Sequence, residues 1–348
     1  MRLAVALVAA ALVAAGGTWL ALRLALRDGL LAVPNARSSH SRATPSGGGL
    51  GIGFAAALLL PLAAWWLAVP WVALVAPAAA VACWCGRRDD RHTLRPRIKF
   101  LVLTVAACSL AASAHVDAAD VPFVGRVGLG PLALPLTVFW LAGFANLFNF
   151  MDGIDGIAGL TAAVTGAVFA IAGLRGGDVA LALEGGTLAA AALGFLPWNF
   201  PRARIFMGDT GSLVLGLLLA DCAVRGAQSG ALPFPAGVLA LGPFLFDATF
   251  TLARRALRGA RLSEAHREHV YQRLARRVGR HPPVSLLYAG FAAGTGALAL
   301  LYADRGEVGR LLSLLVPPAS MLAFAIAVVR EDARRERLAP GAAPARRE

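Results

Sequence analysis

Long apolar stretches alternate with short polar connectors along most of the chain. A membrane-spanning helix needs about 20 consecutive apolar residues, so stretches of this length predict transmembrane helices. Eleven segments fit: 3–22, 50–69, 71–86, 98–115, 132–148, 157–174, 178–196, 211–226, 233–253, 284–303 and 309–329. The predicted fold class is therefore an all-α, polytopic integral membrane protein with about eleven transmembrane helices. A misread hairpin would reduce that number to nine or ten.

The composition agrees with a membrane protein and excludes two other classes. Of the 348 residues, 58% are hydrophobic and 15% are charged, and the mean hydropathy is +0.66. A soluble domain is usually about a quarter charged, and a disordered chain has low hydrophobicity. An ordinary soluble enzyme and a disordered protein are both excluded. We expect one multi-span domain over residues 1–330, followed by a disordered basic tail over 331–348.

The first apolar segment has a second interpretation. Arg2 precedes an alanine-rich stretch, as in a cleaved signal peptide. This apolar run is longer than the usual signal-peptide core, and further apolar segments follow it. We therefore expect residues 3–22 to remain as a span.

The basic residues are unevenly distributed between the two sides of the predicted membrane protein. The net charge is +13, and 27 of the 33 basic residues fall on one side of an eleven-span arrangement. Because cytoplasmic loops are enriched in Lys and Arg, this side is predicted to be cytoplasmic. The N-terminus would then lie outside and the C-terminus in the cytoplasm. The excess of positive charge favours anionic membrane lipid as a partner, and not nucleic acid.

Most polar residues that suit catalysis fall in loops on the basic side: 27–49, 87–99, 146–156, 197–211 and 254–283. In the first loop, His40 precedes the glycine run 47–49, whose backbone could approach a phosphate closely or form a flexible turn. In the second loop, Asp89 and Asp90 precede Lys99, the one lysine of the chain. These residues could contact Mg²⁺, take a proton and hold phosphate, or form a solvated ionic group.

Two further loops carry oxygen-bearing side chains at the ends of apolar spans. They are Asn146, Asn149, Asp152 and Asp155 in one loop and Asn199 and Asp209 in the other. Buried polar groups are costly without partners, so a hard cation or a sugar phosphate would suit the first group; a self-satisfied capping network is the alternative. Asp209 has room for a metal between two glycines. Phe206 could stack on a base or anchor in the membrane interface.

The last loop contains His266, His269 and Arg273 among many arginines. Phosphate binding fits this setting better than zinc, because no His-Glu-x-x-His spacing is present. An amphipathic surface helix on anionic lipid is the alternative. Asp247, inside the preceding span, is expected to pair with Arg254, and a supporting role in the site is also open.

The order of these motifs resembles the polyprenyl-phosphate N-acetylhexosamine-1-phosphate transferases, a branch of glycosyltransferase family 4. The resemblance extends over residues 30–280. It rests on the segment from Pro34 to Gly49, Asp89-Asp90, Asn146 to Gly156, Phe206 to Ser212, and His266-x-x-His269. The residues that follow His269 are similar to those of the enzymes that initiate surface polysaccharides.

The resemblance implies a reaction in the inner membrane of a bacterium, with the active site facing the cytoplasm. A UDP-N-acetylamino sugar, most simply UDP-GlcNAc or a related HexNAc, would react with undecaprenyl phosphate. UMP would leave and a lipid-linked diphosphosugar would remain. Mg²⁺, with Mn²⁺ as an alternative, would neutralise charge on the donor phosphates. A homodimer is left open.

The resemblance also implies roles for individual residues. The implied catalytic residues are Asp89, Asp90, Lys99, Asp209 and His269. The implied metal ligands are Asn149, Asp152 and Asp209. The implied substrate-binding residues are His40, Asn149, Asp152, Asp155, Asn199, Phe206, His266 and Arg273. Whether Asp89 or Asp90 acts as a base or only positions substrate and metal is left open, because a phosphate monoester is largely ionised near pH 7.

Three alternatives remain beside this hypothesis. A phospho-N-acetylmuramoyl-pentapeptide transferase belongs to the same family, but that branch carries consecutive histidines where this chain has His266-Arg267-Glu268-His269. A secondary transporter would place its acids near the middle of the membrane between repeats. A membrane scaffold would not need so many costly polar residues at span ends.

Overall fold

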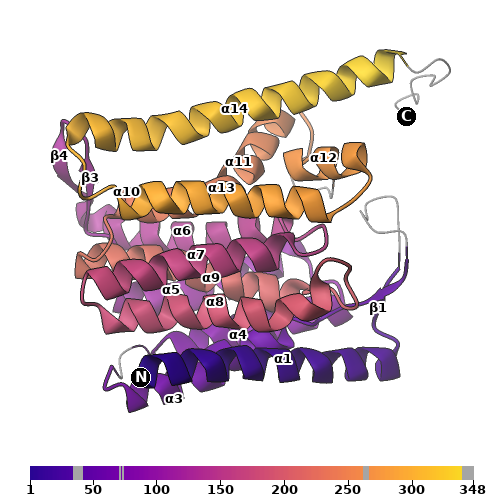
Figure 1. Ribbon diagram of the computed structural model, residues 1–348, viewed down its shortest axis with the longest axis horizontal. Coiled ribbons are helices and arrows are strands. Elements are labelled where there is room, and N and C mark those ends of the chain that lie inside the picture. Colours follow the sequence, from indigo (N-terminus) through magenta and orange to yellow (C-terminus); the bar gives the residue numbers. More distant parts are fainter. Residues whose placement is uncertain (34–41, 70–71, 73, 262–265, 339–348) are drawn as a thin grey trace.

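The computed structural model describes residues 1–33, 42–69, 72, 74–261 and 266–338, and it is mostly helical (Figure 1). The helices are α1 (Arg2–Asp28), α2 (Leu50–Phe54), a π-helical turn (Ala55–Leu59), α3 (Leu60–Trp66), α4 (Val75–Arg91), α5 (Pro96–Ser113), α6 (Ala133–Phe150), α7 (Ile157–Arg175), α8 (Val179–Asn199), α9 (Asp209–Ser229), α10 (Phe234–Ala240), α11 (Gly242–Leu257), α12 (Val270–Val278), α13 (Pro282–Leu300) and α14 (Glu307–Leu338), with a 3₁₀ turn at Gly130–Leu132. Two antiparallel hairpins pair β1 (Leu31–Ala32) with β2 (Thr44–Pro45) and β3 (Ala118–Val121) with β4 (Gly125–Gly128).

The polytopic membrane architecture predicted from the sequence is confirmed. Within the described residues, eight helices are long and apolar enough to span a membrane: α1, α5, α6 with its preceding turn, α7, α8, α9, α13 and α14. The pair α10 and α11 meets the same criteria but bends by 78° at its break. The other two predicted segments form the short helix Leu50–Trp66 and α4, whose last turns are charged. The number eleven and the sidedness of the termini therefore remain predictions.

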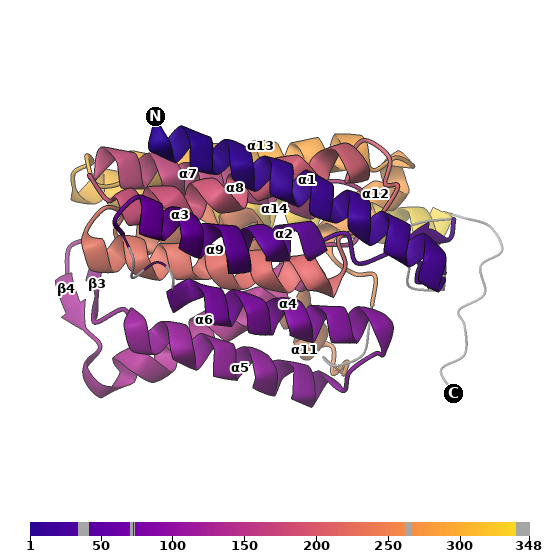
Figure 2. The same cartoon turned by 90° about the horizontal axis from the view of Figure 1, so that it is seen from below.

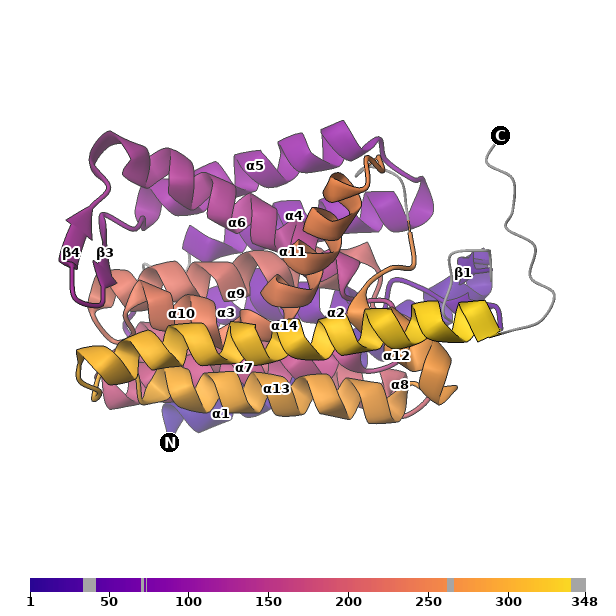
Figure 3. The same cartoon turned by 90° about the horizontal axis from the view of Figure 1, so that it is seen from above.

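Helix α9 forms the centre of the bundle. Over the most apolar 18 residues of α9, 94% are buried inside the protein, whereas the corresponding share in α14 is 17%. The neighbouring α4, α6, α8 and α2 all contact α9, while α1 and α14 lie on the outside (Figures 2 and 3). Its first residue, Asp209, therefore emerges at one end of the most enclosed element of the fold. The β3–β4 hairpin lies at the other end of the bundle (Figure 1).

Close helix approach at the start of α9 depends on glycine. A Cβ atom placed on Gly86 of α4 would overlap the carbonyl group of Asp209, and one placed on Gly49 would overlap Gly211. Only a residue without a side chain lets these backbones pack so closely. The glycines thus bring the ends of α2 and α4 against the first turn of α9.

The expectation of a disordered tail over 331–348 was wrong for residues 331–338, where α14 continues to Leu338. Ion pairs explain why this stretch is ordered. Asp332 accepts from Arg277 of α12 at 2.8 Å and from Arg273 at 3.2 Å. The remaining residues, 339–348, lie outside the described part of the chain.

Two acids inside spans form a buried group with one arginine. Arg225 donates to Asp221 at 2.5 Å, and its Nε lies 3.6 Å from Glu184. All three side chains are at most 3% exposed. Pairing of this kind is what allows charged residues to lie within membrane helices.

Replacing Gly86 with alanine should destabilise the protein. The added methyl group has to displace either α4 or the start of α9, and overpacking of this kind costs about 1–3 kcal/mol. Gly143→Ala is the matched control, because a Cβ there has no heavy atom within 4 Å. Thermal unfolding in detergent should show a lower midpoint for Gly86→Ala only. Equal midpoints for the two variants would contradict the proposed packing.

Candidate active site

Four helix ends meet in a compact charged cluster. Lys99, in the first turn of α5, lies between two carboxylates from other helices. Its Nζ is 2.5 Å from Oδ2 of Asp209 and 3.1 Å from Oδ2 of Asp89. Asp89 also accepts from the backbone N–H of Leu94 at 2.6 Å. The side chains of Lys99, Asp89 and Asp209 are 15–20% exposed, so the cluster is accessible but largely shielded.

Asp90 makes different interactions from its neighbour Asp89. Its Oδ1 accepts from the backbone N–H of Asp209 at 2.9 Å. Its Oδ2 accepts from the backbone N–H and the hydroxyl of Thr210, at 3.2 and 2.5 Å. These are the first N–H groups of α9, which have no partner within the helix. A carboxylate is favoured there by the helix dipole, so Asp90 caps α9 from a neighbouring helix.

Asn149, in the last turn of α6, joins the cluster. Its Nδ2 donates to Oδ2 of Asp209 at 3.2 Å, and its Oδ1 accepts from the hydroxyl of Ser212 at 2.9 Å. Asp152 follows in the turn after α6. Burial, together with the carboxylates of Asp209 and Asp90, raises the pKa of Asp152 to about 8. The cluster therefore carries an excess of negative charge.

Asp155 and Asn199 hold the next turn in place. Asn199 is 4% exposed. It accepts from the N–H of Gly156 at 2.8 Å and donates to the carbonyl of Ile205 at 3.0 Å. Oδ2 of Asp155 lies 3.3 Å from Nδ1 of His281. The buried Asn199 side chain thus links two loops by hydrogen bonds, while Asp155 faces the start of α13.

A cleft of 740 Å³ adjoins this turn. Its lining residues are Arg42, Thr44, Asp155, Pro201, Arg202, Ala203, Phe206, Gly279, Arg280, His281 and Pro282. Small-molecule sites usually measure about 300–1,000 Å³, so the cleft is large enough for a nucleotide-sized ligand. Three arginines and a phenyl ring suit a ligand with phosphates and a base.

The histidine loop lies differently from the predicted site. His269 is 3% exposed and directly precedes α12 as its N-cap, and its Nδ1 is 3.3 Å from Asp247. The ring of His266 stacks on it at 5.0 Å, and burial together with His269 lowers the pKa of His266 to about 4. Arg273 is held by Glu268 and Asp332. None of these three predicted residues lines the 740 Å³ cleft.

The predicted pairing of Asp247 with Arg254 was wrong. Arg254 instead donates to Glu268 at 2.5 Å, as does Arg255. His40 falls outside the described residues. Among the residues that the structure does describe, no three His, Cys, Asp or Glu side chains form a metal site by themselves.

Several residues of the site were missed by the sequence analysis. Arg42, Arg202 and Arg280 were counted only as charges that set orientation, and His281 was not singled out. The sequence feature that could have indicated them is their position in loops that also carry predicted site residues. Nothing in the pattern indicated that they line one cleft.

Comparison with known proteins identifies the family. The sequence model of glycosyl transferase family 4 matches residues 71–227. A probable undecaprenyl-phosphate N-acetylglucosaminyl 1-phosphate transferase of Bacillus subtilis is 32% identical over 278 residues, covering 79% of this chain and 77% of the relative. The chain belongs to glycosyl transferase family 4.

Two further relatives are also enzymes that transfer a phosphorylated sugar, by their names. A decaprenyl-phosphate N-acetylglucosaminephosphotransferase of Mycolicibacterium smegmatis is 32% identical over 330 residues, covering 84% of this chain and 80% of the relative. A phospho-N-acetylmuramoyl-pentapeptide-transferase of Synechococcus is 36% identical over 218 residues, covering 58% of this chain and 62% of the relative. In this family 4 protein, the matched range 71–227 contains the whole Asp89–Lys99–Asp209–Asn149 cluster, and the histidine loop lies beyond it.

The two adjacent aspartates should differ in their effect on stability. Asp90→Asn places an amide N–H₂ group against donors of α9, so the free energy of unfolding should fall by about 1–3 kcal/mol. Asp89→Asn keeps an acceptor for Leu94 and loses a partly exposed ion pair, which should cost less than about 1 kcal/mol. Chemical or thermal unfolding in detergent measures both. Equal losses would contradict the assignment of Asp90 as the cap of α9.

Proposed function

We propose that this family 4 protein transfers an N-acetylamino sugar 1-phosphate from a UDP-sugar to undecaprenyl phosphate, a step that initiates a cell-surface polysaccharide. The observation that carries the proposal is the convergence of Asp89, Lys99, Asn149 and Asp209 at the start of α9, in a protein that also has an arginine-lined cleft. The names of the Bacillus and Mycolicibacterium relatives support the same reaction class. The sugar would be GlcNAc or a related HexNAc.

The proposed step is a phosphoryl transfer. An oxygen of the lipid phosphate attacks the sugar-bearing phosphorus of the donor, and the bond from that phosphorus to the bridging oxygen of UMP breaks. Such reactions depend mainly on positioning and on stabilising charge. Lys99 is held by two carboxylates at a place where its ammonium can donate to phosphate oxygens. Both oxygens of Asp90 accept from α9, so it supports the site as a cap rather than as a base.

Asp89 fits a positioning role as well. It orients Lys99 and is itself fixed by the N–H of Leu94. The lipid phosphate is already largely ionised near pH 7, because its second pKa is about 6. A separate base would therefore add little to the reaction.

A divalent cation fits the donor chemistry of the cluster. Asp209 and Asp152 offer carboxylate oxygens, Asn149 lies beside them, and burial together with the neighbouring carboxylates raises the pKa of Asp152. Mg²⁺ is commonly held by one or two carboxylates together with substrate phosphates, so a complete protein cage is not required. When bound, Mg²⁺ or Mn²⁺ would neutralise charge on the donor diphosphate.

The uridine part of the donor would occupy the cleft. Phe206 offers a ring to the base, and Asp155 offers an acceptor at the cleft wall. Arg202 and Arg280 would face the phosphates. The uneven distribution of arginine supports a cytoplasmic position for this end of the bundle in a bacterial inner membrane, next to anionic lipid.

Asp209→Ala should abolish release of UMP from a UDP-amino sugar in the presence of undecaprenyl phosphate. The change removes the carboxylate that joins Lys99 and Asn149, so a loss of more than about a hundredfold is expected. Asp304→Ala is the control, because it makes the same chemical change at an exposed position. UMP is measured by chromatography of the purified proteins. Full activity in Asp209→Ala would remove this residue from the reaction.

Binding of Mn²⁺ near pH 7 should release close to one proton. Below pH 8 the Asp152 carboxyl is mostly protonated, because its pKa is raised to about 8, and a bound cation would favour the carboxylate. The release should shrink toward zero well above pH 8 and fall strongly in Asp152→Asn. Calorimetry in buffers of different ionisation enthalpy measures it. A proton release that Asp152→Asn leaves unchanged would show that another group titrates.

A further inference from the structure

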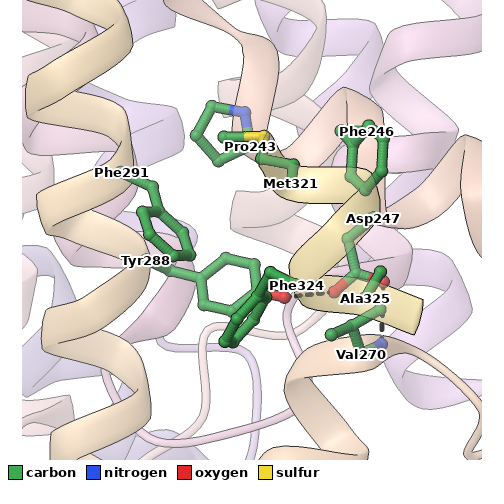
Figure 4. A pocket seen from close by; sticks show the side chains of 9 residues that line it. All are labelled: Pro243, Phe246, Asp247, Val270, Tyr288, Phe291, Met321, Phe324 and Ala325. Carbon is green, nitrogen blue, oxygen red and sulfur yellow. Dashed lines mark hydrogen bonds between the residues drawn. The ribbon is translucent and has the colours of Figure 1, made fainter. Parts of the chain in front are cut away.

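Asp247 is a buried carboxylate in the second half of the broken span. It lies in α11, is 1% exposed, and faces the space between α11, α12 and α13. Figure 4 shows its carboxylate between Tyr288 and Val270, within an otherwise apolar group that includes Phe246 and Phe324. A buried carboxylate is costly unless its oxygens are well satisfied, so its partners indicate what it holds.

Five groups from three helices and one loop meet this carboxylate. Oδ1 accepts from the N–H of Val270 at 2.9 Å and from the hydroxyl of Thr251 at 3.2 Å. Oδ2 accepts from the N–H of Tyr271 at 3.0 Å and from the hydroxyl of Tyr288 at 2.5 Å. Nδ1 of His269 is 3.3 Å from Oδ1. The two backbone donors are the first two N–H groups of α12, so Asp247 fastens the start of that helix.

Tyr271 links the start of α12 to the end of α6, next to the charged cluster. Its hydroxyl donates to the carbonyl of Phe150 at 3.1 Å, and its side chain is fully buried. Phe150 is the last residue of α6 and follows Asn149 directly. A Cβ on Gly153 would overlap the Tyr271 hydroxyl, so the ring packs tightly against the turn after α6. A continuous chain of contacts therefore runs from Asp247 to the turn that bears Asn149 and Asp152.

We propose that Asp247 is a positioning residue for the transfer reaction. It fixes the start of α12, so that Tyr271 holds the turn 149–153 with Asn149 and Asp152 beside Asp209. The proposal rests on the function proposed above. The network needs an acceptor at both carboxyl oxygens, because two backbone N–H groups cannot reverse their polarity. Asparagine has the same shape but only one acceptor oxygen, so its N–H₂ group would face the backbone N–H of either Val270 or Tyr271.

The test compares Asp247→Asn, Tyr271→Phe and their combination. Each single change should lower kcat for UMP release by about tenfold or more, with KM for the UDP-sugar within about threefold, because the substrate cleft is untouched. The double variant should lose no more than the more severe single variant, since both changes break one chain of contacts. The proposal would be overturned if the loss of kcat in the double variant equalled the product of the two single losses. It would also be overturned if Asp247→Asn folded and kept the wild-type kcat.

Thr251→Val and Tyr288→Phe are the matched controls. Each removes one hydroxyl donor to the same carboxylate but leaves both N–H groups of α12 bound. Both should keep kcat within about threefold of wild type. A tenfold loss in these controls would show that every hydrogen bond to the carboxylate is needed, and not specifically those from α12, and would contradict the proposed role.

Hydrogen exchange separates this proposal from the proposed function. Asp247→Asn and Tyr271→Phe should both speed amide exchange in residues 148–153, whether or not the wild type releases UMP. If the wild type releases no UMP from any UDP-amino sugar, the proposed function fails and exchange alone decides the positioning role. If Asp247→Asn does not fold, Tyr271→Phe decides. Unchanged exchange at 148–153 would overturn the proposal.

Discussion

The site depends on how the first turn of α9 is satisfied inside the protein. This helix is enclosed almost along its whole length, so its free N–H groups cannot rely on water. Asp90 supplies the acceptors from α4, and glycines at positions 49, 86 and 211 let the neighbouring backbones approach. The position of Asp209 follows from that packing.

The same packing concentrates charge. Asp89 and Asp209 lie against one lysine, and burial together with the nearby carboxylates of Asp209 and Asp90 raises the pKa of Asp152. In a shielded setting a surplus of carboxylates is relieved by protons or by a cation. A transferase of diphosphates can use this property, because the cation that relieves the carboxylates also relieves the substrate. The cluster and its proposed ligand therefore share one electrostatic requirement.

The sequence predicted the helical membrane fold and much of the charged cluster. Costly polar residues at the ends of apolar segments indicated Asn149 and Asp209, and Lys99 was indicated as the one lysine of the chain; the structure brings these three together. Hydropathy reports how apolar a segment is, but not its bend, so the 78° break between α10 and α11 was not foreseen. The ordered end of α14 depends on Asp332 meeting arginines of α12, a contact between distant segments.

The histidine loop shows the same limit. Its residue types suit phosphate binding, yet His269 is buried on Asp247, and Arg273 is paired with acids. Which arginines line the cleft is decided by tertiary packing, and they come from three separate loops. Spacing along the chain could not select them.

The most direct measurement is a structure of the purified protein with Mn²⁺ and UDP-GlcNAc, with the ion located by its anomalous scattering. Mn²⁺ should contact Asp209, with the diphosphate beside Lys99 and the uracil near Phe206. A cation and nucleotide bound at the opposite end of the bundle, or remote from Asp209, would contradict the proposed site.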